Sequence, residues 1–208
     1  LNEQNKEILE QRQQIAEQYQ TMLQKNEELN IQKQLVDLKN SDIQDSLRYA
    51  KRIQTALQPN VALLNDYFED SFVFSSAKDV VSGDFYLIYN TSVEQGFSED
   101  RVLIVAADCT GHGVPGAIMS VLGINTIHKN INEHKITNPA QILERLDKNL
   151  NQILIQGKSE NNLIADGMDI AIFSFCKNSY ELCYTIAKFP HLLIRGSEVI
   201  ALKSQKAS

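Results

Sequence analysis

Apolar side chains recur at every seventh position through the first 58 residues of the chain. They are Leu1, Ile8, Ile15, Met22, Leu29, Val36 and Ile43. The residues between them are rich in Gln, Glu and Lys, and the segment contains neither Gly nor Pro, so strong helix formers dominate. A seven-residue period keeps one seam of a helix facing a partner in a left-handed supercoil. The pattern therefore predicts one long helix over residues 1–58 that forms a parallel coiled coil, and hence a homodimer.

A second seam, four positions after each member of the first, is mostly polar. It comprises Asn5, Arg12, Tyr19, Asn26, Lys33, Asn40 and Leu47. Polar residues at such positions fix the register of a coiled coil at some cost in stability. The alternative is a single amphipathic helix that lies on its own domain, but so narrow an apolar stripe would bury little surface.

The pattern changes after Pro59 and Asn60, which break the helix. Short apolar runs bounded by turn signals predict strands, and apolar residues at helical spacing predict helices. The expected strands cover 71–74, 84–90, 102–108, 169–176, 180–187, 191–195 and 198–202, and the expected helices cover 115–130 and a segment that starts at Asn138-Pro139. This order indicates an α+β layered fold rather than alternating βαβ units. The sequence thus predicts a coiled-coil signalling helix at 1–58 and a globular domain at 59–208.

Composition limits the classes of function. The 208 residues carry a formal charge of −6, which argues against a basic nucleic-acid-binding surface. No apolar run reaches the roughly 18 residues that a membrane span needs. Cys109, Cys176 and Cys183 are odd in number and form no CxxC pair, which favours a reducing compartment over a disulfide framework. We therefore expect a cytoplasmic protein with no nucleic-acid partner and no membrane segment.

The candidate chemistry lies in the stretch VLIVAADCTGHGVPGAIMS. An apolar run ends there in Asp108, and three glycines follow that let the backbone turn sharply and approach a ligand. The glycines are Gly111, Gly113 and Gly116. If 84–90 and 101–108 pair as an antiparallel hairpin, Asp84 lies at the same end as Asp108. Two converging carboxylates suit a hard cation such as Mg²⁺ or Mn²⁺, although each acid could instead be a turn residue or a helix cap.

Several motifs together resemble those of the metal-dependent PPM-type Ser/Thr protein phosphatases of the SpoIIE-like branch. They are YAKRIQTALQP, VVSGDFY, AADCTGHGVPGAIMS and DGMDIAIFSF, in the expected order between residues 48 and 202. The resemblance implies a layered β-sandwich flanked by helices. It gives metal-binding and catalytic roles to Asp84 and Asp108, with the backbone carbonyl of Cys109 as a further ligand. It also implies two Mn²⁺ or Mg²⁺ ions in the complete domain, and a metal-activated water that attacks phosphoserine or phosphothreonine.

By the same resemblance, the chain is expected to be the output domain of a bacterial signalling protein that acts on a phosphorylated protein, such as an anti-sigma-factor antagonist. Two departures from the family pattern bear on activity. A further acidic pair that completes the family's metal site would lie beyond Ser208, so the domain is expected to be truncated at its C-terminus and the chain could be inactive. Where the family carries Gly followed by His or Asn ahead of Pro, this chain has Lys188 and Phe189.

Two alternatives stay open at the level of sequence. The missing acids and the altered AKFP segment are compatible with a non-catalytic dimeric signalling module that binds a partner without turnover. The three glycines also spell GxGxxG between a strand and a helix, as in dinucleotide-binding domains, although the next expected element is a helix rather than a strand. Further polar residues near the motifs are interpreted as loop or strand-end groups: Asp79, His112, Asp166, Asp169 and Lys188.

Overall fold

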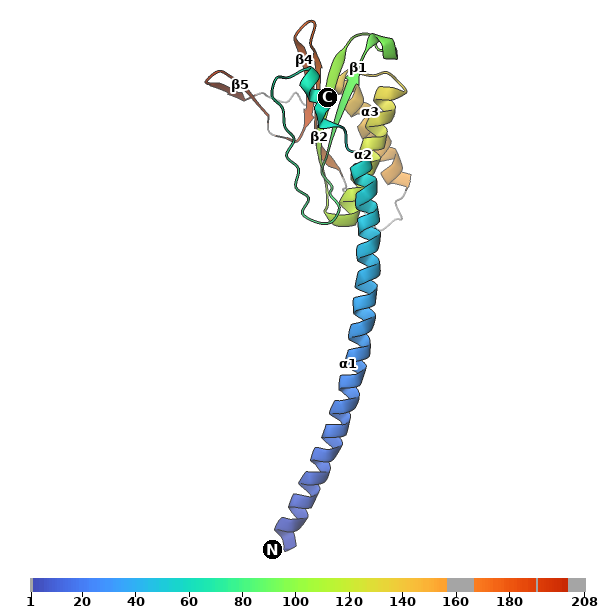
Figure 1. The fold of residues 1–208 in the computed structure, drawn as a ribbon, viewed down its shortest axis with the longest axis vertical. Coiled ribbons are helices and arrows are strands. Elements are labelled where there is room, and N and C mark those ends of the chain that lie inside the picture. Colours follow the sequence, from blue (N-terminus) through green and yellow to red (C-terminus); the bar gives the residue numbers. More distant parts are fainter. Residues whose placement is uncertain (1, 157–166, 190, 202–208) are drawn as a thin grey trace. The chain divides into compact units, whose positions relative to one another are not determined.

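The computed structural model describes residues 2–156, 167–189 and 191–201. The chain divides into two compact units, Leu1–Leu47 and Arg48–Ser208. The first unit is helical throughout its described length, since α1 runs over Asn2–Ala56 (Figure 1). The long helix predicted from the sequence is therefore confirmed. It ends shortly before Pro59, whose ring disfavours helical backbone in the residue that precedes it.

The heptad positions of α1 are exposed in the first unit. Each of six apolar residues at these positions exposes between 50% and 67% of its surface. They are Ile8, Ile15, Met22, Leu29, Val36 and Ile43. An apolar stripe of this length on a single helix has nothing to pack against within its own unit. The coiled-coil dimer stays a prediction, and this exposed seam supports it.

The second unit is built on a four-stranded antiparallel sheet. Its strands, in their order across the sheet, are β1 (Phe85–Thr91), β2 (Arg101–Cys109), β3 (Met168–Cys176) and β4 (Glu181–Ala187). β-branched and aromatic residues are frequent in these strands because they pack well on a pleated surface. In the register of the sheet, Phe85 pairs with Ala107, and Asp108 pairs with Asp169. The hairpins predicted around residues 84–108 and 169–187 are confirmed.

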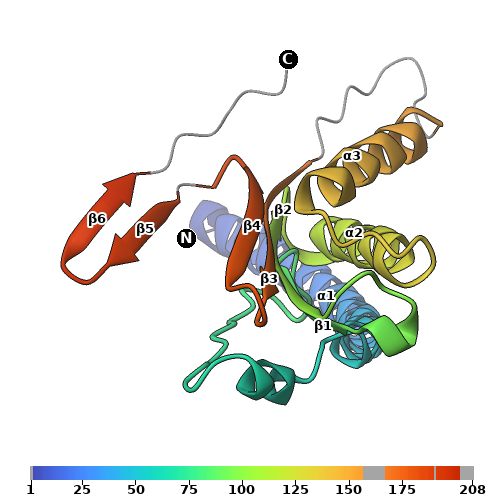
Figure 2. The ribbon, with the colours of Figure 1, turned by 90° about the horizontal axis from the view of Figure 1, so that it is seen from above.

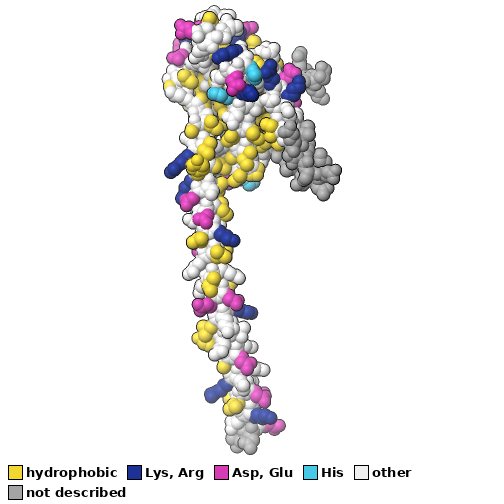
Figure 3. All heavy atoms as spheres, turned by 90° about the vertical axis from the view of Figure 1, so that its right-hand side faces the viewer, with side chains coloured by type: hydrophobic (Ala, Val, Ile, Leu, Met, Phe, Trp, Pro, Cys, Tyr) yellow, Lys and Arg dark blue, Asp and Glu magenta, His cyan; other side chains and the backbone are white. Residues whose placement is uncertain are grey.

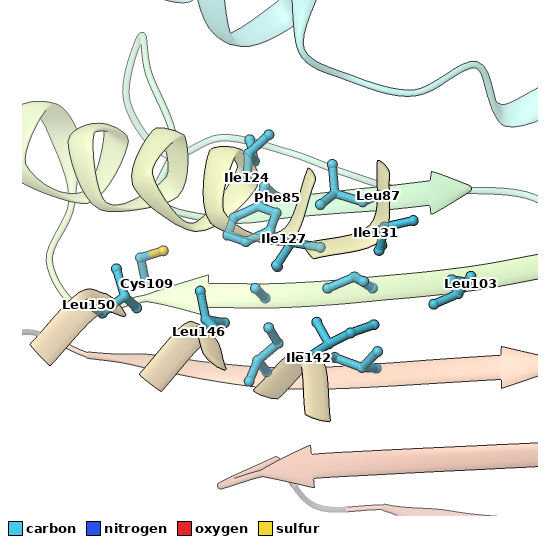
Figure 4. Packing of buried hydrophobic residues seen from close by; sticks show 14 of the residues in the cluster. Phe85, Leu87, Leu103, Cys109, Ile124, Ile127, Ile131, Ile142, Leu146 and Leu150 are labelled. Carbon is cyan, nitrogen blue, oxygen red and sulfur yellow. The ribbon is translucent and has the colours of Figure 1, made fainter. Parts of the chain in front are cut away.

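Two helices cover one face of this sheet (Figure 2). They are α2 (Gly113–Asn132) and α3 (Pro139–Gln156). Ile127 and Ile131 of α2, and Ile142 and Leu146 of α3, are at most 1% exposed and belong to the main hydrophobic core. Figure 4 shows these side chains between the helices and the strands, together with Phe85 of β1. Both helices predicted from the apolar spacing are therefore confirmed.

The opposite face of the sheet carries a smaller apolar cluster. Leu64, in the short 3-10 helix η1 (Val61–Asp66), packs with Ile88 of β1 and Val102 of β2. Phe68 lies against Phe175 of β3, with ring centroids 5.7 Å apart. Helices thus cover one side of the sheet, and an irregular segment covers the other. The ends of β1 and β2 lie at the edge of the core between these two layers.

Three shorter elements complete the described fold. A 3-10 turn, η2 (Val93–Gln95), lies in the β1–β2 connection, and β5 (Leu192–Arg195) and β6 (Glu198–Ala201) form a separate hairpin after β4. The predicted last strand pair and the α+β layered fold class are therefore confirmed. Among the described helices, none combines the length and the apolar character that crossing a bilayer requires.

The strand expected at 71–74 is wrong. These residues are irregular, and Phe72 and Phe74 are 88% and 86% exposed. A short run of aromatic and β-branched residues suits a strand, but a strand forms only where a neighbouring strand accepts its backbone hydrogen bonds. No described strand pairs with this segment.

Candidate metal centre

Asp84 and Asp108 meet at one end of the β1–β2 hairpin. Because Phe85 pairs with Ala107, the residue before Phe85 comes opposite the residue after Ala107. Partial desolvation, a hydrogen bond with Asp108 and the negative charge of Asp108 raise the pKa of Asp84 above its usual value. The register of the hairpin therefore places Asp84 beside Asp108 at the same end, as the sequence predicted.

The loop after Asp108 needs its three glycines for two different reasons. Gly111 and Gly113 have φ angles of +89° and +65°, a left-handed conformation that other residues rarely adopt. Gly116, in the first turn of α2, lies so close to Gly111 that a Cβ built on it would be 2.5 Å from the carbonyl oxygen of Gly111. The glycines therefore turn the chain sharply after Asp108 and let the first turn of α2 pack directly on the loop.

Cys109 offers this site its carbonyl oxygen rather than its thiol. The residue is 3% exposed, and burial, together with the charges of Asp108 and Asp84, raises the pKa of the thiol to about 12. In the metal-free chain the thiol therefore stays protonated near neutral pH. A Cβ built on Gly83 would lie 3.1 Å from the carbonyl oxygen of Cys109, so this oxygen lies beside the residue that precedes Asp84.

The segment that carries Asp84 is anchored to the last turns of α1 within the second unit. The side-chain amide of Gln54 donates hydrogen bonds to the Ser82 carbonyl (2.7 Å) and the Ser120 hydroxyl (3.0 Å), and its oxygen accepts from the Ser82 N–H (3.1 Å). The Ser82 hydroxyl in turn accepts from the Asp84 N–H at 3.0 Å. Gln54 is 8% exposed, so water competes little for these bonds. They hold the backbone from which the Asp84 carboxylate projects.

The donor atoms that converge here are all oxygens. Carboxylate and carbonyl oxygens are the ligands that Mn²⁺ and Mg²⁺ prefer, and these ions often keep several waters. Within residues 2–156, 167–189 and 191–201, no group of three or more His, Cys, Asp and Glu side chains is placed to hold a metal ion. The donor set of Asp84, Asp108 and the Cys109 carbonyl fits a hard cation and leaves its other coordination positions to water or to further groups.

Comparison with known proteins gives the family. Residues 98–206, just over half of the chain, match the family described as Stage II sporulation protein E (SpoIIE). The chain belongs to the SpoIIE family. Among solved structures, it is similar to the SiaA-PP2C domain of Pseudomonas aeruginosa, with 32% sequence identity and a TM-score of 0.65.

The SpoIIE assignment and the PP2C similarity make this a PPM-type phosphatase fold, which confirms the resemblance found in the sequence motifs. The structural match covers 80% of this chain and 62% of the SiaA-PP2C chain, so this chain spans less than two thirds of that protein's length. A comparison with curated protein sequences gave no match. The dinucleotide-binding alternative is wrong, because the described strands pair only in antiparallel fashion and α2 is followed by α3 rather than by a strand.

His112, at the start of α2 in this SpoIIE-family chain, pairs with Asp79. Its Nδ1 lies 3.1 Å from Oδ2 of Asp79, and it makes no side-chain capping bond to the helix. The two side chains are 74% and 42% exposed. The interpretation of His112 as a hydrogen-bonding loop residue agrees with this contact. No sequence pattern marks Asp79, 33 residues earlier, as its partner.

A further acid of the motifs, Asp169, lies next to this site on β3. Asp169 pairs with Asp108 in the strand register, but its carboxylate is 3.9 Å from the ammonium group of Lys188. Asp166 lies outside the described residues.

Lys188 stands where members of the SpoIIE-like branch carry glycine, and its φ is +66°. A left-handed conformation costs a non-glycine residue about 1 to 2 kcal/mol. The exposed ion pair of Lys188 with Asp169 offsets little of this cost. Lys188→Gly is therefore expected to raise the free energy of unfolding by about 0.5 to 1 kcal/mol, measured by urea denaturation. Lys188→Ala, which keeps the strain, is the control and is expected to change stability far less. A less stable glycine variant would show that the strain is not real.

Proposed function

We propose that the chain carries a metal-dependent protein serine/threonine phosphatase that serves as the output domain of a bacterial signalling protein. The observation that carries this proposal is the convergence of Asp84, Asp108 and the Cys109 carbonyl at a loop shaped by glycines. These are the positions to which the SpoIIE-like motifs give metal-binding roles. The set contains only oxygen donors, which is the chemistry that Mn²⁺ and Mg²⁺ require.

In the proposed site, Asp84 and Asp108 hold the metal ions through their carboxylates, and Cys109 contributes its carbonyl oxygen. Bound Mn²⁺ or Mg²⁺ would activate a water for attack on phosphorus and offset negative charge on the phosphoryl oxygens. The first turn of α2 contains no acidic residue, so its free N–H groups add partial positive charge where an anionic phosphoryl group is expected. The hydrogen bonds from Gln54 hold the Asp84 backbone in place before the metal or the substrate arrives.

The proposed partners follow from the same resemblance and from the exposed helix. The substrate is a phosphorylated protein of the kind that anti-sigma-factor antagonists represent. A second copy of the chain is the proposed partner of the exposed heptad seam of α1, in a parallel coiled coil. All three cysteines are free, which is compatible with the proposed cytoplasmic location.

Phosphate release from a small aryl phosphate, with and without added Mn²⁺, tests the proposed activity. We expect turnover that requires Mn²⁺ and that stops when the metal is chelated. Phosphoserine and phosphothreonine peptides are expected to release phosphate under the same conditions. A folded chain that binds Mn²⁺ but releases phosphate from none of these substrates would favour the non-catalytic, partner-binding alternative.

A further inference from the structure

A pocket of about 600 Å³ lies between the C-terminal end of α2 and the helix α3. Lys129 and Asn130 of α2 line it on one side, and Arg145 and Lys148 of α3 line it on the other. Its volume is in the range of sites that hold small molecules, about 300 to 1,000 Å³. No part of the proposed phosphatase mechanism uses these residues.

The pocket gathers positive charge on a chain whose formal charge is −6. Lys129, Arg145 and Lys148 contribute three cations, His134 adds an imidazole, and Glu144 is the carboxylate in the lining. Among the described residues, none of the three cations forms an ion pair within 4.0 Å. Figure 3 shows Lys, Arg and His side chains at one end of the second unit, on the side where α2 and α3 lie, with Asp and Glu side chains among them. The residues that line the pocket itself carry more positive than negative charge.

Asn130 supplies an independent sign of a missing ligand. It is 2% exposed, and its side-chain nitrogen is buried without any hydrogen-bond partner. A buried donor left unpaired destabilises the fold, so such groups are rare unless something else satisfies them. Asn130 belongs to the lining of the same pocket as the three cations. An oxygen atom of a bound anion would be the acceptor that this amide lacks.

We propose that this pocket binds a small, multiply charged anion that carries phosphate groups. The guanidinium of Arg145 presents paired donors that match phosphate oxygens, and the two lysines add point charges. The lining comes from two helices and offers no free strand edge to which an extended acidic peptide could add. The Asn130 side-chain nitrogen is covered in the free chain, so its contact with the ligand requires a change of this side chain's rotamer.

This site is separate from the candidate metal centre. Lys129 follows Gly113 by sixteen residues along α2, so the two ends of the helix are about 24 Å apart at 1.5 Å per residue. The proposal therefore does not rest on phosphatase activity, and its failure would leave that activity untouched. Binding to metal-stripped protein keeps the two sites distinguishable, since phosphate oxygens would need the metal to bind between Asp84 and Asp108.

Calorimetric titration of the metal-stripped chain with inorganic pyrophosphate tests the proposal. We expect one saturable site, and at least tenfold weaker binding in the double variant Arg145→Gln/Lys148→Gln. Lys33→Gln/Lys39→Gln removes the same charge from exposed positions of α1 and is expected to change affinity less than about twofold. Equal weakening in both double variants, or no saturable binding up to millimolar concentrations, would overturn the proposal. Tighter binding of hexaglutamate than of pyrophosphate would overturn the assignment to phosphate.

The variant Asn130→Leu tests whether the Asn130 amide binds the ligand or only stabilises the fold. Removing an unpaired donor is expected to leave the free energy of unfolding of the ligand-free chain unchanged or higher. Pyrophosphate affinity is expected to fall several-fold in the same variant. An unchanged affinity would exclude Asn130 from the site. A large loss of stability without ligand would show that the amide has a structural partner, and either result contradicts its proposed role.

Discussion

Replacing Gly116 by alanine is expected to lower the free energy of unfolding by about 2 to 3 kcal/mol. The added Cβ would lie 2.5 Å from the carbonyl oxygen of Gly111 and 3.2 Å from the Cα of Gly83. Both neighbours are backbone atoms, so no side chain can rotate away to relieve the contact. The loop or the helix must shift, and since this loop joins Asp108 to α2, Mn²⁺ affinity is expected to fall as well. Urea denaturation and calorimetric titration with Mn²⁺ measure the two effects.

Gly167→Ala is the matched control for this substitution. A Cβ at Gly167 would find its nearest neighbour, the Thr110 hydroxyl, at 3.9 Å. Gly167 and Thr110 are joined by hydrogen bonds that use only the backbone of Gly167, so an alanine keeps them. The expected change in stability is within about 0.5 kcal/mol. Equal losses in the two variants would mean that the close approach of Gly116 to Gly111 is not the cause.

The sequence predicts the regular elements of this protein because their patterns are local. The seven-residue period and the lack of Gly and Pro were enough to predict α1, and apolar runs between turn signals were enough for β1 and β2. The segment 71–74 is an equally strand-like apolar run, yet it forms no strand because pairing depends on a neighbour elsewhere in the chain. The spacing GxGxxG does not by itself distinguish a dinucleotide-binding loop from this one, because the distinction depends on strands and helices elsewhere in the chain. Only the antiparallel sheet and the passage from α2 directly to α3 separate this loop from a dinucleotide site.

The candidate metal centre was partly predictable. A hairpin brings the start of one strand beside the end of the next, so the approach of Asp84 to Asp108 follows from the strand assignment alone. The residue that anchors Asp84, Gln54, stands in a glutamine-rich helix where nothing in the sequence marks it out. Asn130 is likewise one polar residue among many on α2, and only its buried, unpaired amide draws attention to it. Residues whose role depends on contacts distant in the chain are the ones that the sequence could not identify.

Asp108→Asn is expected to weaken Mn²⁺ binding more than about a hundredfold, since even substitutions behind the direct ligands cost 10- to 100-fold. Mn²⁺-dependent phosphate release is expected to fall by about a thousandfold or more, because the metal supplies several kcal/mol of transition-state stabilisation. The substitution keeps the shape of the side chain and removes its charge. The pKa of Asp84 is raised by burial, by its hydrogen bond with Asp108 and by the negative charge of Asp108, and the substitution removes that charge, so the metal-free variant is expected to be at least as stable as the parent chain.

Asp169→Asn is the matched control, because Asp169 pairs with Asp108 across β2 and β3 and loses the same charge at the neighbouring position. Its carboxylate lies 3.9 Å from the ammonium group of Lys188, which offsets its charge, so Mn²⁺ affinity is expected to fall far less than in Asp108→Asn. Calorimetric titration with Mn²⁺ and urea denaturation of both variants separate a metal ligand from a residue that only adds negative charge. Similar losses of affinity in the two variants would show that the metal responds to the general charge of this sheet edge. Asp108 would then have no direct bond to the metal, and the proposed phosphatase chemistry would lose its central residue.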